Sequence, residues 1–129
     1  MQCDLISGHW LAPGKMLVSP KGAIRLRFQS SDGYLILECL DDSQLPEEVF
    51  RPYWHNGVRV SPENVAGAKA MMHSDGNFVV SFPSTAVTWS TGTNGNPGAI
   101  LRCQDDGNLV VYSRDGQPLW ASNTHVGPR

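Results

Sequence analysis

The chain has 129 residues, of which 40% are hydrophobic and 17% charged, and its formal net charge is −2. This length suits a single domain with a buried core. The small net charge gives no electrostatic reason to expect a nucleic acid or an anionic membrane as partner. No apolar run approaches the roughly 20 residues of a membrane-spanning helix.

The N-terminal stretch MQCDLISGHWLAPGK lacks a basic segment followed by a long apolar one. No secretory signal is therefore predicted, and both a cytoplasmic protein and a mature secreted form agree with this stretch. The cysteines are Cys3, Cys39 and Cys103. An odd number without a CxxC pair argues against a metal knuckle and against a full disulfide framework. One bridge stays open, with Cys3–Cys39 the favoured pair.

Apolar and polar residues alternate with a period of two in much of the chain, and no stretch has a persuasive helical period. The alternation predicts strands, in chain order, at 23–29, 34–39, 68–73, 77–82, 99–104 and 108–113. An Asp-Gly turn separates the two strands of each successive pair, and this turn is a strong hairpin signal because its backbone accommodates positive φ. The sequence predicts an all-β fold.

The hairpins belong to an internal repeat, which is the first feature to establish in any chain. Asn77 and Asn108 each precede a tryptophan, Trp89 and Trp120, by 12 residues, and small or polar residues follow in WSTGT and WASNT. In the first copy the equivalent Trp54 comes later because of an insertion around DDSQLPEE. We predict one domain, 1–129, with repeats at roughly 15–56, 57–92 and 93–124 and approximate threefold symmetry. The three repeat tryptophans are predicted to meet near the axis, whereas Trp10 lies outside the pattern and could be core or ligand platform.

Alternation also assigns side chains to the two faces of each hairpin. The residues predicted to face inward are Ile24, Leu26, Phe28, Leu35, Leu37, Ala70, Met72, Phe78, Val80, Leu101, Cys103, Leu109 and Val111. The third repeat then presents a strip of outward residues at two-residue spacing: Gln104, Asp106, Asn108, Val110 and Tyr112.

Such a strip suits a neutral, polyhydroxylated ligand. The carboxylate accepts hydrogen bonds from hydroxyls, the amides donate and accept, and the phenol adds a hydroxyl beside an aromatic edge. A valine offers an apolar contact for the C–H face of a sugar ring. Taken singly these residues are ordinary strand and turn chemistry. As one spaced set inside a triplicated unit they predict a binding surface.

The pattern Q-x-D-x-N-x-V-x-Y formed by these five residues resembles the mannose-site motif of the bulb-type (monocot, B-type) mannose-binding lectins. PLWASNT (118–124) and the opening LAPGKMLVSPKGAIRLRFQSSDGYLIL also resemble that family, so the likeness covers essentially the whole chain. The resemblance implies a β-prism II fold of three four-stranded antiparallel sheets. It also implies that the Asp and Asn bind the 2-hydroxyl of mannose, Gln the 3-hydroxyl and Tyr the 4-hydroxyl, while Val packs on the ring. No metal or cofactor is implied.

The other two repeats depart from the motif. The second has His73, Asp75, Asn77 and Val79, with Ser81 in place of the tyrosine, and is predicted to be an impaired site. The first has Gln29, Asp32, Tyr34 and Ile36, with one extra turn residue and Glu38 in place of the tyrosine. It is predicted to be inactive.

A catalytic function finds little support in the sequence. The histidines His9, His55, His73 and His125 are scattered without metal-ligand spacing. The carboxylates Asp32 and Glu38 lie on one sheet face rather than across a cleft, as a glycosidase would need, and are read as a solvated edge. The residues Asp41, Asp42, Glu47 and Glu48 are predicted to form an exposed loop. DDGN resembles the start of a calcium loop, but the rest of that pattern is absent.

Two functions from different classes are carried forward. The first is a non-enzymatic lectin that binds mannose or mannose-rich glycans, and the resemblance suggests a role in defence. The second is a protein-interaction or toxin-like module that has kept the scaffold and lost most sugar binding, since fold alone does not decide function. The resemblance also suggests a homodimer formed by exchange of C-terminal strands from PLWASNTHVGPR, in which Leu119 and Trp120 would pack on the partner.

Overall fold

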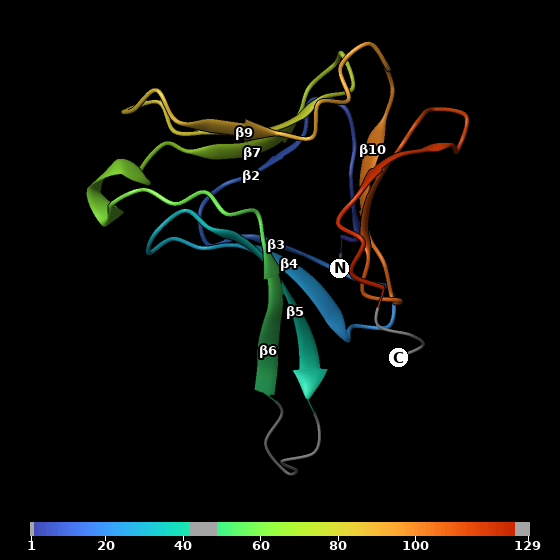
Figure 1. Cartoon of the computed structure of the whole chain (residues 1–129), viewed down its shortest axis with the longest axis horizontal. Helices are drawn as coiled ribbons and strands as arrows, with labels where there is room; N and C mark the ends of the chain where they lie inside the picture. Colours follow the sequence, from blue (N-terminus) through green and yellow to red (C-terminus); the bar gives the residue numbers. More distant parts are fainter. Residues whose placement is uncertain (1, 42–48, 126–129) are drawn as a thin grey trace.

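The computed structural model describes residues 2–41 and 49–125. Within these residues twelve strands form three four-stranded antiparallel sheets (Figure 1), and one short 3-10 helix spans Pro62–Asn64. The first sheet consists of β3 (Met16–Val18), β4 (Ile24–Phe28), β5 (Leu35–Asp41) and β6 (Val49–His55). The second consists of β2 (Trp10–Leu11), β7 (Lys69–Met72), β8 (Phe78–Ser81) and β9 (Thr88–Ser90). The third consists of β1 (Asp4–Leu5), β10 (Ile100–Cys103), β11 (Leu109–Tyr112) and β12 (Pro118–Ala121). The three-sheet prediction is confirmed.

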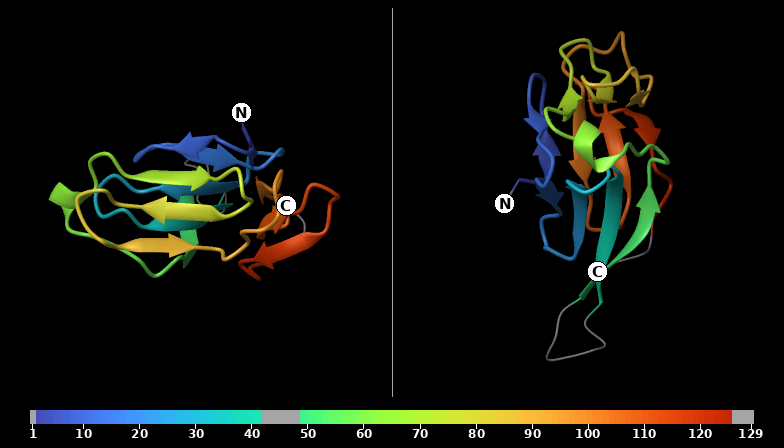
Figure 2. Two further views of the ribbon diagram at one scale, coloured as in Figure 1. Left: turned by 90° about the horizontal axis from the view of Figure 1, so that it is seen from above. Right: turned by 90° about the vertical axis from the view of Figure 1, so that its left-hand side faces the viewer.

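The N-terminal segment ties the three sheets together. It supplies β1 to the third sheet, β2 to the second and β3 to the first, each as an outer strand paired with the repeat's own hairpin. In Figure 2 these strands lie along one side of the molecule. The second and third sheets are therefore completed by strands distant in sequence from their own repeats, whereas β3 directly precedes the other strands of the first sheet.

The core lies between the three sheets. Every residue predicted to face inward is fully buried, including the aromatic side chains of Phe28 and Phe78. Phe82, which follows β8, is also buried and contacts Phe28 edge to face, with ring centroids 6.2 Å apart. The period-two pattern thus fixes which face of each hairpin is removed from water.

The three repeat tryptophans meet, as predicted. The ring centroids lie 6.4 Å apart for Trp54–Trp89, 6.2 Å for Trp54–Trp120 and 5.7 Å for Trp89–Trp120, all in edge-to-face geometry. Aromatic pairs prefer this arrangement because the positive ring edge faces a negative ring face. The rings come from β6, β9 and β12, one from each sheet, and are half-buried against the core.

The six strands predicted from alternation are present, each within two residues of its predicted ends. The three tryptophan strands do not alternate cleanly. Strand β6 contains Pro52 and is bulged opposite Leu37 and Glu38, β12 is bulged opposite Val111 and Tyr112, and β9 has three residues. Bulges place two residues opposite one and break the period-two pattern.

The favoured cysteine pairing was wrong. All three cysteines are free thiols. Cys39 lies on β5 opposite Ile24, in the first sheet, whereas the Cys3 carbonyl accepts a hydrogen bond from the backbone N–H of Cys103, at the third sheet. Burial raises the pKa of the Cys103 thiol to about 12, which agrees with its prediction as a core residue.

The predicted exposed loop falls mostly outside the described residues, because Asp42, Glu47 and Glu48 are not among them. Asp41 ends β5 and pairs with Arg51, with 2.6 Å between Oδ2 and Nε. In the described part of the chain no helix has the length and apolar character needed to cross a membrane.

Candidate functional site

The third repeat brings its five predicted residues to one outer sheet face, which we call the third-repeat face. The turn between β10 and β11 holds Asp106, whose Oδ1 accepts a hydrogen bond from the backbone N–H of Asn108 at 2.9 Å. Gly107 has φ of 91°, a conformation that favours glycine. This Asp-to-backbone bond is a common way of closing a tight turn.

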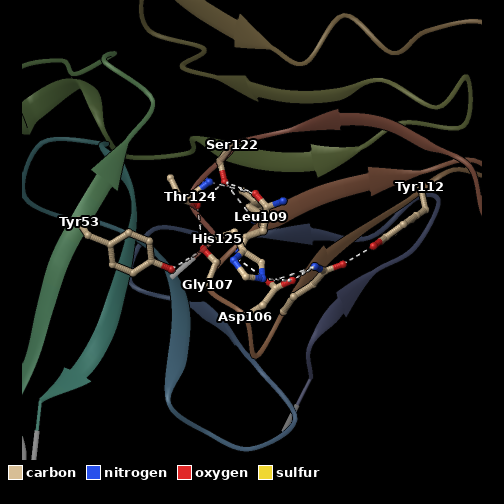
Figure 3. Close-up of polar contacts among 10 residues, drawn as sticks. Tyr53, Asp106, Gly107, Leu109, Tyr112, Ser122, Thr124 and His125 are labelled. Atoms are coloured by element: carbon tan, nitrogen blue, oxygen red, sulfur yellow. Dashed lines mark hydrogen bonds and ion pairs between the residues drawn. The ribbon is translucent and has the colours of Figure 1, made fainter. Parts of the chain in front are cut away.

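A chain of hydrogen bonds links the polar side chains of the third-repeat face (Figure 3). The amide nitrogen of Gln104 lies 3.1 Å from each carboxylate oxygen of Asp106, and the Tyr112 hydroxyl donates to the Gln104 amide oxygen. The His125 Nε2 lies 3.8 Å from Asp106 Oδ2. The groups are therefore held in place before any ligand arrives, which lowers the entropy cost of binding.

Asn108 is oriented by the strand that follows it. Its Oδ1 accepts from the Ser122 hydroxyl at 3.1 Å and from the backbone N–H of Thr124 at 3.3 Å. A backbone N–H only donates, so the atom facing it must be the amide oxygen. The amide nitrogen of Asn108 makes no hydrogen bond with any described residue, so it is the donor left for a ligand.

The backbone between Asp106 and Asn108 is fixed from two sides. The Gly107 carbonyl accepts from the Thr124 hydroxyl at 2.8 Å and from the Tyr53 hydroxyl at 2.6 Å. Tyr53 comes from β6 of the first sheet, so the third-repeat face depends on a neighbouring sheet (Figure 3). Ser122, Thr124 and Tyr53 were not predicted as functional residues. The repeated flanks WSTGT and WASNT carried the signal for the first two, and nothing in the sequence signalled Tyr53.

Val110 lies in the same row of the third sheet as Arg102 and Ala121 and is only 3% exposed. It forms the floor of the face rather than a projecting contact. Arg102 donates two hydrogen bonds to Asp4 of β1, from Nε to Oδ1 at 2.8 Å and from Nη2 to Oδ2 at 3.0 Å. Its guanidinium carbon lies 5.6 Å from the centroid of the Tyr112 ring. The hydrogen bonds from Arg102 hold the pKa of Asp4 below its usual value despite partial burial.

The second-repeat face (His73, Asp75, Asn77 and Val79) has the same arrangement around its asparagine. The backbone N–H of Thr93 donates to Asn77 Oδ1 at 3.1 Å, and the Thr93 hydroxyl donates to the Gly76 carbonyl at 2.6 Å. Asp75 Oδ1 accepts from the Asn77 backbone N–H at 3.0 Å. Gly76 cannot be replaced, since its φ is 90° and a Cβ there would lie 2.1 Å from the Asn96 carbonyl oxygen.

Two features distinguish the second-repeat face. Ser81 stands where Tyr112 stands in the third repeat, so no phenol is present. Trp10, left open by the sequence, lies on this outer face in the row of Met71 and Val79 and is 48% exposed. The Lys69 ammonium lies over its ring, 4.5 Å from the ring centroid. Trp10 is therefore a surface residue and not part of the core.

The first-repeat face (Gln29, Asp32, Tyr34 and Ile36) keeps the turn and loses the rest. The Gln29 amide nitrogen donates to Asp32 Oδ1 at 2.9 Å, and the Tyr34 backbone N–H donates to the same oxygen at 3.0 Å. The Tyr34 ring, in the position of Asn108, packs on the His55 ring with centroids 4.8 Å apart. No side-chain amide stands there to meet a hydroxyl.

The prediction of a solvated edge at Glu38 was wrong. Glu38 is 2% exposed, and its Oε1 accepts from Arg25 Nε at 2.5 Å and from Arg27 Nε at 3.0 Å. Burial alone would raise the pKa of Glu38, but the hydrogen bonds from Arg27 and Arg25 outweigh it and lower the pKa. The pairing depends on strand register, which places both arginines on β4 next to β5.

Among the described residues, no group of three or more His, Cys, Asp or Glu side chains is placed to hold a metal ion. What the third- and second-repeat faces offer is a set of hydrogen-bond donors and acceptors on a shallow surface.

No family model matches the chain. In sequence it is 37% identical over 59 residues to the B-type lectin plumieribetin of Scorpaena plumieri, an alignment that covers 46% of this chain and 50% of plumieribetin. The chain thus matches about half the length of that curated relative.

Solved structures match over nearly the whole chain. A lectin of Marasmius oreades has a TM-score of 0.76 and 31% identity, covering 98% of this chain and 95% of its own. A structure described as a monomeric monocot mannose-binding lectin from Gastrodia elata has a TM-score of 0.74 and 28% identity, covering 97% and 100%. The mannose-specific agglutinin of snowdrop (Galanthus nivalis) bulbs, in complex with methyl-α-D-mannoside, has a TM-score of 0.65 and 28% identity, covering 98% and 100%. These proteins are lectins, in agreement with the prediction of a non-enzymatic protein.

On this evidence the chain belongs to the bulb-type (B-type) mannose-binding lectin family, with a β-prism II fold.

Proposed function

We propose that this protein binds mannose-containing glycans without a metal, chiefly through the third-repeat face. The observation that carries the proposal is the orientation of Asn108. Its amide oxygen is engaged by Ser122 and Thr124, which leaves its amide nitrogen as a donor, while its backbone N–H donates to the Asp106 carboxylate on the same face. A donor next to an acceptor is what one sugar hydroxyl requires, because a hydroxyl both donates and accepts.

The remaining groups complete a donor and acceptor balance for mannose. The axial 2-hydroxyl would accept from Asn108 and donate to Asp106. The 3-hydroxyl would accept from the Gln104 amide nitrogen, and the 4-hydroxyl would donate to the oxygen of Tyr112, whose own proton goes to Gln104. Val110 would form the floor beneath the ring. Each polar group of the face then has a partner in the bound state.

Weak affinity per face follows from the shallow surface, since few groups are desolvated and the gain must offset the lost freedom of the ligand. Several faces engaging one branched glycan would raise the overall affinity through effective concentration. The second-repeat face supports weaker binding in this proposal, because Asp75 and Asn77 keep the pair for a 2-hydroxyl while Ser81 provides no phenol. The first-repeat face has Tyr34 where the asparagine is needed and does not bind mannose.

Calorimetric titration of methyl α-mannoside, with chelator present, into wild type and Asn108→Ala tests the proposal. We expect wild-type binding in the millimolar range that is largely lost in Asn108→Ala. The matched control is Asn77→Ala, which removes the equivalent amide of the second repeat and should leave most of the wild-type signal. Undiminished binding in Asn108→Ala would move the main site to the second repeat. No binding of mannoside or mannan to wild type would favour the protein-interaction module instead.

A homodimer stays part of the proposal. Strand β12 pairs with β11 of the same chain, and Trp120 completes the tryptophan triad. Exchange of C-terminal strands would reproduce the same pairing with a partner's β11 and use Leu119 and Trp120 at the interface. The last four residues of that segment lie outside the described part of the chain. Sedimentation at micromolar protein checks this proposal, and a monomer would reject it.

A further inference from the structure

The outer face of the first sheet is unlike an ordinary solvent-facing sheet surface. An antiparallel sheet that packs one face on the core usually presents polar side chains on the other. Here Val18 of β3, Leu40 of β5 and Phe50 of β6 share the outer face with Arg25 of β4. The sheet thus has apolar side chains on both faces, and no other sheet of the described residues packs on the outer set.

The polar part of this face carries an excess positive charge. Glu38 is 2% exposed and is shared between Arg25 and Arg27, whose side chains are 28% and 32% exposed. The pKa of Glu38 is lowered, so its carboxylate is ionised at neutral pH. Among the described residues, two guanidinium groups share one carboxylate, which leaves an excess of one positive charge in this cluster of a protein whose overall charge is −2.

Arg25 holds that charge at the edge of a hollow. Its Nε donates to Glu38, its guanidinium carbon lies 3.6 Å from the centroid of the Phe50 ring, and its Nη groups make no hydrogen bond with any described residue. The hollow has a volume of about 370 Å³ and is lined by Met16, Val18, Lys21, Arg25, Leu40 and Phe50, with the turn that includes Ser19. We call it the first-sheet groove.

The carboxylates near the groove that belong to described residues already have partners. Glu38 is held by its two arginines, Asp41 pairs with Arg51 at 2.6 Å, and Asp105 accepts from the Lys21 backbone N–H at 2.8 Å. The buried Ser19 hydroxyl accepts from the Ile24 backbone N–H at 3.1 Å. Among the described residues that line the groove, Lys21 and Arg25 are the two cations, beside an apolar wall.

We propose that the first-sheet groove binds a small organic carboxylate with an aliphatic or aromatic body. The Nη groups of Arg25 and the ammonium of Lys21 would take the carboxylate, since a guanidinium edge matches its two oxygens. Val18, Leu40 and Phe50 would cover the apolar body. The volume lies within the range of roughly 300 to 1,000 Å³ of small-molecule sites. A fully hydroxylated sugar does not fit this wall, because its hydroxyls would lose hydrogen bonds to water there.

Titration of the full chain with octanoate below its micelle concentration, followed by ¹H–¹⁵N correlation spectra, tests the proposal. We expect saturable shifts at the amides of residues 16–19, 21, 22, 40 and 50. Octanol lacks the charge and octylammonium reverses it, so both should bind at least tenfold more weakly than octanoate. Glucuronate keeps the carboxylate and replaces the apolar body with hydroxyls, and it should also bind at least tenfold more weakly.

Two variants test whether Lys21 and Arg25 bind the carboxylate of octanoate. Lys21→Met leaves the Glu38 ion pairs untouched and should weaken octanoate binding several-fold. Arg25→Met should weaken it further, with the melting temperature followed to show that the variant is folded. The matched control Lys15→Met removes an exposed lysine outside the groove and should change nothing.

The outcomes are decisive in each direction. Equal binding of octanol and octanoate would overturn the proposal, because the groove would then be only an apolar surface. Binding unchanged in Lys21→Met and Arg25→Met, or no saturable shift at these amides, would overturn it as well. Octanoate binding that persists in Asn108→Ala, and that methyl α-mannoside does not displace, would show a site separate from the third-repeat face.

Discussion

The third-repeat and first-repeat faces share one backbone plan and differ in chemistry. In both, an aspartate in the turn accepts from the backbone N–H two residues later, at 2.9 Å in the third and 3.0 Å in the first. At the next positions the third repeat has Asn108 and Tyr112, whereas the first has Tyr34 and Glu38. The turn and the core-facing alternation are common to both repeats, so the same backbone plan is kept while the outward residues differ.

The second repeat separates the two contributions. It keeps the asparagine held by Thr93 and the turn aspartate, but it has Ser81 in place of the phenol. Orientation of the amide is therefore independent of the tyrosine. Comparison of the three faces therefore separates the amide, which the second and third repeats share, from the phenol at the end of the strand, which the third repeat has and the second lacks.

Asn108→Tyr places the first-repeat residue in the third repeat and should have the largest effect. It removes the amide donor and fills the space above Val110, so we expect at least a tenfold loss of mannoside affinity by calorimetry. A melting temperature close to wild type is the control, since Tyr34 occupies the same position in the first repeat. Retained affinity would mean that the amide is not the group that binds.

Glu38→Gln tests the cluster of Arg25, Arg27 and Glu38, in which Glu38 stands at the first-repeat position equivalent to Tyr112. Loss of the carboxylate leaves Arg25 and Arg27 without their partner, and we expect a loss of about 1–3 kcal/mol in the free energy of unfolding at pH 7, less than for a fully buried pair because both arginines are partly exposed. Urea unfolding of wild type and variant measures it.

The same variant predicts a pH dependence. The folded-state pKa of Glu38 is lowered, so its contribution is fully present above the unfolded value of about 4.3 and is lost as the pH falls through the folded-state value. The difference in stability between wild type and Glu38→Gln should narrow as the pH falls below about 4.3. A constant difference down to acid pH would contradict the assignment.

Ser81→Tyr restores the missing phenol to the second repeat. Measured in an Asn108→Ala background, it should raise mannoside affinity several-fold, because one added hydrogen bond contributes about 0.5–1.5 kcal/mol. Ser81→Phe adds the ring without the hydroxyl and should give a smaller gain. Equal gains from both variants would assign the effect to the ring.

Tyr53→Phe should have the smallest effect. It removes the bond to the Gly107 carbonyl while Thr124 still donates there, so we expect a loss of up to about 1 kcal/mol in stability and a two- to threefold loss of affinity at the third-repeat face. The second-repeat face, studied in an Asn108→Ala background, should be unaffected. An equal loss at both faces would indicate a general destabilisation.

The sequence predicted the features that depend on local periodicity. Alternation identified the buried residues of all three hairpins, and the spacing from turn to tryptophan predicted the triad. The motif predicted that Gln104, Asp106, Asn108, Val110 and Tyr112 share one face. Each of these follows from the chain within a single repeat.

The missed features arise between segments that are distant in sequence. Tyr53 lies at the bulge of β6 and donates to Gly107 of the third sheet, and neither the bulge nor this contact can be read from residues 49–55. The burial of Glu38 depends on the β4–β5 register, and the separation of Cys3 from Cys39 depends on the N-terminal strands pairing with the sheets in reverse order. The supporting roles of Ser122 and Thr124 were visible only as repeated flanks.

A single titration tests the central claim most directly: methyl α-mannoside added to ¹⁵N-labelled wild type with chelator present, with all three faces followed at once. We predict the largest shifts at the amides of residues 104–112 and 122–124, weaker shifts at 73–81 that saturate later, and none at 29–38. Shifts that begin at 29–38, or no saturable shifts at 104–112, would contradict the assignment of mannose binding to the third-repeat face.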